Sequence, residues 1–98
     1  MGFFTRAELR VRDAARSARI AAIKADLCEG LGLTDDDAVS VNEIACAEAG
    51  CPDIETVVLV MRAGEPTRAF RIRRPLDGVA PADLAALRAE EADARSGV

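Results

Sequence analysis

CAEAGCPDIETVVLVM, residues 46–61, is the stretch on which the predicted fold depends. Two cysteines bracket a short acidic turn that contains glycine, and a proline–aspartate pair then interrupts the chain. The VVLVM segment that follows is apolar on both faces of a strand, which is typical of a strand in the middle of a sheet or beneath a helix. We therefore expect residues 45–53 to form a compact connection into a central strand at 55–62.

The residues that follow predict a hairpin. Residues 63–66, AGEP, have the composition of a turn, and residues 67–74 return as a strand. Alternation along this strand directs Phe70 and Ile72 toward the core and Arg71 and Arg73 away from it.

The segment before the cysteines is open to two interpretations. Residues 39–45 are rich in β-branched side chains and alternate at first, and a slip in the apolar phase then predicts a bulge near Asn42 and Glu43. The alternative is a second helix capped by Thr34 and its three following aspartates, which would run to Gly50. We favour the strand.

Helices are predicted at both ends. Residues 5–8 fit a capping box, and an apolar stripe places residues 18–29 on the core, with Gly30 as the left-handed stop. The stripe consists of Leu9, Ile20, Ile23, Leu27 and Leu31. It is interrupted near the front, so we expect residues 1–17 to be a partly free basic start. Pro81 opens a final helix with Leu84 and Leu87 as its core contacts, and residues 90–98 are expected to fray.

The predicted fold class is therefore α+β: an N-terminal helix, a three-stranded antiparallel meander and a C-terminal helix, in one domain over residues 1–98. A chain of 98 residues has room for one modest core. No apolar run is long enough to span a bilayer and no secretory signal is visible, so we expect a cytoplasmic protein.

The cysteines are the candidate metal ligands. Cys46 and Cys51 are spaced to reach one zinc or iron ion, with Glu48 or Cys28 as a further ligand. The chain has three cysteines and no histidine, so a closed four-ligand site would need a carboxylate or a second subunit. The alternatives are a reversible disulfide or reactive thiol, and a purely structural role in which Cys28 faces the core; in that last case no cofactor is bound.

The arginines are the candidate partner-binding residues: Arg12, Arg16 and Arg19 on the first helix, and Arg71 and Arg73 on the hairpin. Acidic residues outnumber basic ones by 17 to 13, and tyrosine and tryptophan are absent, so nucleic acid is not the expected partner. Without histidine or a recognisable nucleophile motif, no catalytic site is indicated, and we predict no enzyme. The predicted function is that of a small adaptor that binds another protein or itself, and no membrane partner is expected. The alternative is a metallochaperone or redox switch centred on Cys46 and Cys51.

CAEAGCPDIET, followed by an apolar strand and a basic hairpin, resembles a segment of a group of small bacterial proteins of uncharacterised function, which carry CxExGCPxxET. The resemblance spans residues 39–84 and implies no activity, substrate or site.

Overall fold

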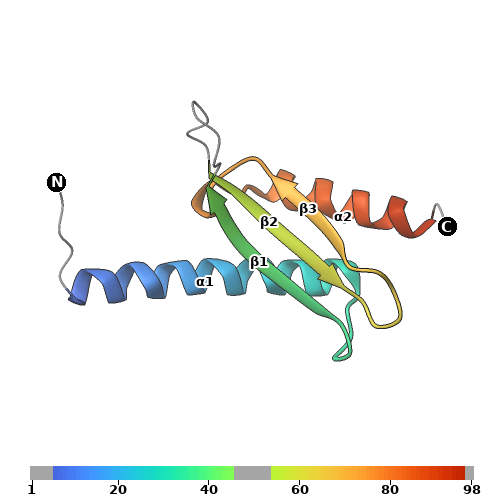
Figure 1. Ribbon diagram of the computed structural model, residues 1–98, viewed down its shortest axis with the longest axis horizontal. Coiled ribbons are helices and arrows are strands. Elements are labelled where there is room, and N and C mark those ends of the chain that lie inside the picture. The colour runs from blue at the N-terminus through green and yellow to red at the C-terminus, as the bar shows by residue number, and fades with distance from the viewer. Residues whose placement is uncertain (1–5, 46–53, 97–98) are drawn as a thin grey trace.

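A computed structural model describes residues 6–45 and 54–96 of the chain. Its elements, in order, are helix α1 (Arg6–Leu31), strands β1 (Ala38–Ala45), β2 (Ile54–Met61) and β3 (Arg68–Ile72), the 3₁₀ turn η1 (Leu76–Gly78) and helix α2 (Pro81–Ser96). The predicted α+β class, with one helix, three strands and a second helix, is confirmed (Figure 1).

The sheet is an antiparallel meander in the order β1-β2-β3, with β2 in the middle as the sequence predicted. The strand interpretation of residues 39–45 is confirmed, and the helical alternative from Thr34 is excluded. Thr34 instead begins a turn in which its backbone N–H donates to Asp37 Oδ2 at 2.9 Å. Asp37 Oδ1 also accepts from the Ala63 N–H at 2.9 Å, which ties this turn to the β2–β3 turn.

The predicted bulge near Asn42 and Glu43 is wrong. Every residue of β1 has one partner in β2, from Ala38 opposite Met61 to Ala45 opposite Ile54. The regular alternation therefore continues, which leaves Ile44 39% exposed and turns Glu43 toward the helix side. Glu43 is tolerated there because its carboxylate has two partners, Arg16 and the Leu76 N–H.

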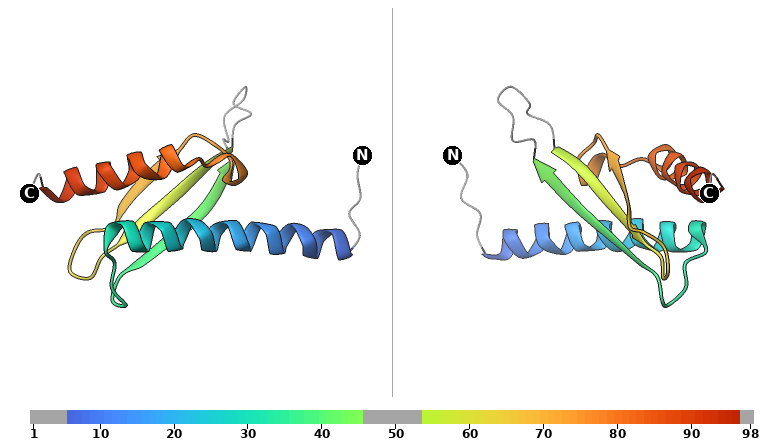
Figure 2. Two further views of the ribbon diagram at one scale, coloured as in Figure 1. Left: turned by 180° about the vertical axis from the view of Figure 1, so that it is seen from behind. Right: turned by 45° about the vertical axis from the view of Figure 1, so that its right-hand side comes forward.

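Both helices lie on one side of the sheet, and the core fills the space between them (Figures 1 and 2). The helices contribute Ile23, Leu27, Leu84 and Leu87, and the sheet contributes Val39, Val41, Val58, Val60, Phe70 and Ile72. Leu76 and Val79, in and after η1, complete the core. The inward orientation predicted for Phe70 and Ile72 is confirmed.

Helix α1 ends two residues later than the sequence predicted. The left-handed residue is Gly32, with φ 65°, and not Gly30. The Leu33 N–H donates to the Cys28 carbonyl at 3.0 Å and the Gly32 N–H donates to the Glu29 carbonyl at 3.2 Å, which together form a Schellman cap. Gly30 lies inside the helix, where a Cβ atom would collide with the Arg88 side chain of α2. A larger residue at this position would require the Arg88 side chain to move.

Helix α2 continues to Ser96, beyond residue 90, where the sequence predicted fraying. The reason is that Glu91 is fully buried and bonded to Arg62 and Arg68. These bonds hold the last turns of α2 against the sheet.

The opposite end of the molecule is more open. The first part of α1 projects past the sheet (Figure 1), and its residues 13–18 are all exposed. The molecule is accordingly elongated, with extents of 51 × 33 × 23 Å. Within residues 6–45 and 54–96, neither helix has a stretch long and apolar enough to traverse a bilayer.

Candidate functional site

The side of the sheet that faces away from the helices is the first candidate surface, and we call it the outer face. Strand alternation places on it Ser40, Asn42 and Ile44 of β1, Glu55, Val57, Leu59 and Met61 of β2, and Ala69 and Arg71 of β3. Val57, Leu59 and Met61 are half-buried and form a continuous apolar row along the middle strand. In the part of the chain that the structure describes, both helices pack on the opposite side and no element covers this row.

Arginine borders the apolar row on the β3 side. Arg71 lies directly opposite Val57, its side chain is 67% exposed, and its Nε is 3.6 Å from Glu55 Oε2. Arg73, the residue after β3, is also exposed. On the β1 side the neighbours are neutral, because Asn42 lies opposite Val57 and Ser40 lies opposite Leu59. The outer face is therefore apolar in the middle and basic along one side.

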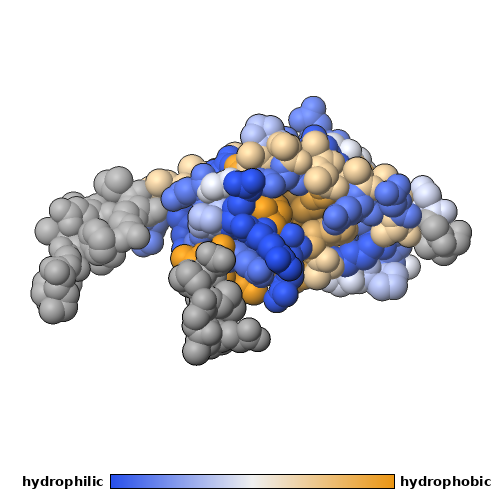
Figure 3. Space-filling model, turned by 90° about the horizontal axis from the view of Figure 1, so that it is seen from above, coloured by the Kyte–Doolittle hydropathy of each residue, from blue (hydrophilic) through white to orange (hydrophobic). Residues whose placement is uncertain are grey.

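Seen from above, hydrophobic side chains reach the surface between strongly hydrophilic ones (Figure 3). On this face of the molecule, hydrophobic and hydrophilic side chains therefore lie side by side.

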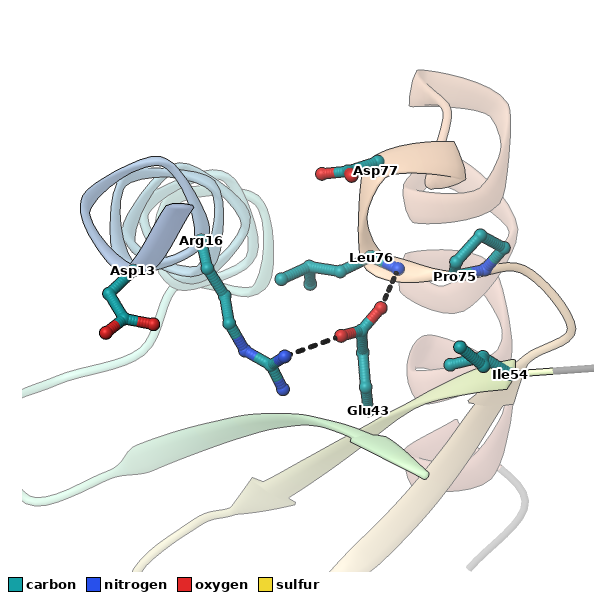
Figure 4. A pocket seen from close by; sticks show the side chains of 7 residues that line it. All are labelled: Asp13, Arg16, Glu43, Ile54, Pro75, Leu76 and Asp77. Carbon is teal, nitrogen blue, oxygen red and sulfur yellow. Dashed lines mark hydrogen bonds and ion pairs between the residues drawn. The ribbon is translucent and has the colours of Figure 1, made fainter. Parts of the chain in front are cut away.

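A groove between α1, the end of β1 and η1 is the second candidate (Figure 4). It has a volume of about 490 Å³ and is lined by Asp13, Arg16, Glu43, Ile54, Pro75, Leu76 and Asp77. Arg16 Nη1 lies 2.9 Å from Glu43 Oε1, and Glu43 Oε2 accepts from the Leu76 N–H at 2.7 Å. The polar groups in the middle of the groove therefore bind one another and hold η1 beside α1.

Arg19 continues this connection one turn further along α1. Its Nε donates to the Leu76 carbonyl at 3.4 Å, and its Nη2 donates to the Val79 carbonyl. Arg16 and Arg19 thus both have partners within the fold, whereas Arg71 and Arg73 face outward. Arg12 belongs to the first part of α1. Partner binding by these arginines stays a prediction.

Of the four predicted metal ligands, Cys28 alone belongs to the described residues. Cys46, Glu48 and Cys51 lie outside the described residues, and Cys28 is exposed on α1. The expectation that Cys28 faces the core is wrong, because the adjacent Leu27 takes the core position and a helix rotates the next residue away by about 100°. In residues 6–45 and 54–96 no group of three His, Cys, Asp or Glu side chains is placed to hold a metal ion. Zinc or iron binding stays a prediction.

The strongest charge cluster was not predicted from the sequence. Glu91 of α2 is fully buried, with Arg62 Nε at 2.7 Å from its Oε2 and Arg68 bonded to both carboxylate oxygens. Arg62 Nη2 also donates to the Leu31 carbonyl at the end of α1, at 2.9 Å. The cluster connects β2, β3 and both helices. The partners are 23 and 29 residues from Glu91 along the chain, so no short motif in the sequence indicates it.

The charges of this cluster are stabilised by their neighbours. Hydrogen bonds from Arg68 and then Arg62 hold the pKa of Glu91 below its usual value of 4.5, although burial acts in the opposite direction. The same bond to Glu91 raises the pKa of Arg68. Glu91 and Arg68 are therefore held in their charged forms, and every member of the cluster has a partner within the fold, which indicates a structural role for the cluster.

No protein-family model, no curated protein and no solved structure matches this chain.

Proposed function

We propose that this protein is a non-enzymatic accessory protein that binds another protein, or a second copy of itself, through the outer face of its sheet. The observation that supports the proposal is the row Val57, Leu59 and Met61, which is apolar and only half-buried on a strand whose other face is fully packed. Exposed apolar surface rimmed by polar groups is typical of interaction sites.

The contacts of the arginines modify the binding surface predicted from the sequence. Arg16 and Arg19 already have partners in β1 and around η1, so we assign the binding role to the hairpin side of the molecule, at Arg71 and Arg73. The pair between Arg71 and Glu55 is long and solvent-exposed, so little free energy is lost if a partner's carboxylate replaces Glu55.

The test is Leu59→Asp, which places a charge in the centre of the outer face. Ala85→Asp is the matched control, because Ala85 is exposed on α2, on the other side of the molecule. Proteins recovered with the tagged chain are compared quantitatively for the parent and both variants, and the molar mass is measured by light scattering over a range of concentrations. We expect Leu59→Asp to lose a partner or the self-association that the parent and Ala85→Asp retain.

Circular dichroism melting of each variant shows that the loss does not come from unfolding. The proposal is wrong if folded Leu59→Asp recovers the same proteins as the parent and has the same mass at every concentration.

A further inference from the structure

The dimensions of the outer face match a single helix. Neighbouring strands lie about 4.8 Å apart, so the distance from β1 to β3 across β2 is about 10 Å, close to the diameter of an α-helix. β2 has eight residues, and at about 3.3 Å per residue the outer face is about 26 Å long along this strand. A helix of about 17 residues has that length.

The charged residues around the outer face indicate which charge a bound helix should carry. Arg71 lies on the β3 side opposite Val57, the exposed Arg73 follows two residues later just after β3, and the β1 side has the neutral Ser40 and Asn42. Among the described residues of the outer face the one acidic side chain is Glu55, and it is already beside Arg71. A helix with carboxylates along one border of its apolar stripe would therefore complement this face.

A second copy of the chain fits less well. Two outer faces packed on each other would bring the arginines of both copies into one interface. The acidic side chain of that face, Glu55, is already paired with Arg71 of its own copy. Like charges brought together in an interface are unfavourable.

We infer that the outer face binds an acidic amphipathic helix of a partner protein. Apolar side chains at helical spacing pack on Val57, Leu59 and Met61, and carboxylates on one flank of the helix pair with Arg71 and Arg73. This inference rests on the proposed function and specifies the chemistry of the partner.

The experiment uses two synthetic 18-residue helical peptides and the full chain. Both peptides have the same leucine stripe; one has a glutamate-rich polar face and the other a lysine-rich one. Affinity is measured by fluorescence anisotropy at low and high salt. We expect the glutamate peptide to bind the parent roughly tenfold more tightly than the lysine peptide, with a preference that shrinks at high salt.

The charge-reversed variant Arg71→Glu/Arg73→Glu makes the test specific. Both side chains are exposed, so the variant is expected to fold, and it should invert the preference between the two peptides. Leu59→Asp should abolish binding of the glutamate peptide, while Ala85→Asp should leave it unchanged.

The possible results separate the inference from the proposed function. Equal binding of both peptides, binding of neither, or binding that survives Leu59→Asp overturns the inference. If the peptides fail but Leu59→Asp still removes a recovered partner or self-association, the proposed function stands and only the occupant is wrong. If Leu59→Asp changes nothing in either experiment, both are wrong.

Discussion

The two faces of β2 have almost the same composition but different surroundings. Val58 and Val60 on the inner face are completely buried between the sheet and the helices. Val57 and Leu59 on the outer face are half-buried, and no helix of residues 6–45 and 54–96 packs over them. Apolar composition alone therefore does not show which face of a strand belongs to the core. An apolar side chain contributes strongly to folding only where another element of the same chain packs on it.

The inner face should be far more sensitive to substitution than the outer face. Val58→Asp places an unpartnered carboxylate in the core and is expected to cost about 4 kcal/mol or more, enough to unfold a domain of this size. Val57→Asp, its neighbour on the outer face, should cost about 1 kcal/mol and leave the fold intact. Urea denaturation followed by circular dichroism measures both, and equal losses would show that the two faces do not differ in this way.

A second prediction concerns Glu91 of α2, the carboxylate that is buried on the helix side of the sheet. Glu91→Gln removes the carboxylate that pairs with Arg62 in a nearly closed site, and it leaves Arg68 with Glu65 alone as its counter-ion, so we expect a loss of about 3 kcal/mol in the free energy of unfolding. Glu90→Gln is the matched control, because Glu90 is the exposed neighbour on α2. It should change stability by no more than about 0.5 kcal/mol. Similar melting curves for the two variants would contradict the structural role of the cluster.

A smaller effect is expected from acid. The pKa of Glu91 is lowered in the folded state mainly by Arg68, and the pKa of Asp37 is lowered by the backbone N–H groups of Thr34 and Ala63. The unfolded chain therefore takes up protons first, so the contribution of these groups is fully present above the ordinary carboxyl pKa values of 4.5 and 3.8 and is lost as pH falls toward the lowered ones. In a fraction of the folded molecules these carboxylates stay ionised in this range, which limits the loss of stability.

Urea denaturation at several values from about pH 6 to about pH 3 tests this dependence. Glu91→Gln should show a shallower decline than the parent because it lacks one of the titrating groups. A decline of the same steepness in both proteins would show that Glu91 does not contribute.

The sequence predicted most of the architecture. Alternation identified the strands, the AGEP turn identified the hairpin, and Pro81 marked the start of α2. The errors came where one residue's partner is distant in the chain. The apolar pattern around Glu43 predicts a bulge, and it does not indicate that Arg16 and the Leu76 N–H bind the Glu43 carboxylate on the inner side of the sheet. The sequence predicts Gly30 as the helix stop, whereas α1 continues to Leu31 and the left-handed residue is Gly32.

The candidate site was predicted in part. The outward orientation of Arg71 and Arg73 followed from alternation and is confirmed by their exposure, while their role in binding stays a prediction. The sequence does not indicate the internal contacts of Arg16 and Arg19, because their partners, the Glu43 carboxylate and the backbone carbonyls of Leu76 and Val79, are distant in the chain.

The sequence by itself determined the order of helices and strands, because side-chain periodicity and turn chemistry are properties of neighbouring residues. Only the tertiary structure decided which face of β2 the helices cover, where Glu43 and Glu91 find their partners, and therefore which apolar surface is left outside. These outcomes depend on groups that meet only after the chain has folded, and no local pattern encodes that meeting.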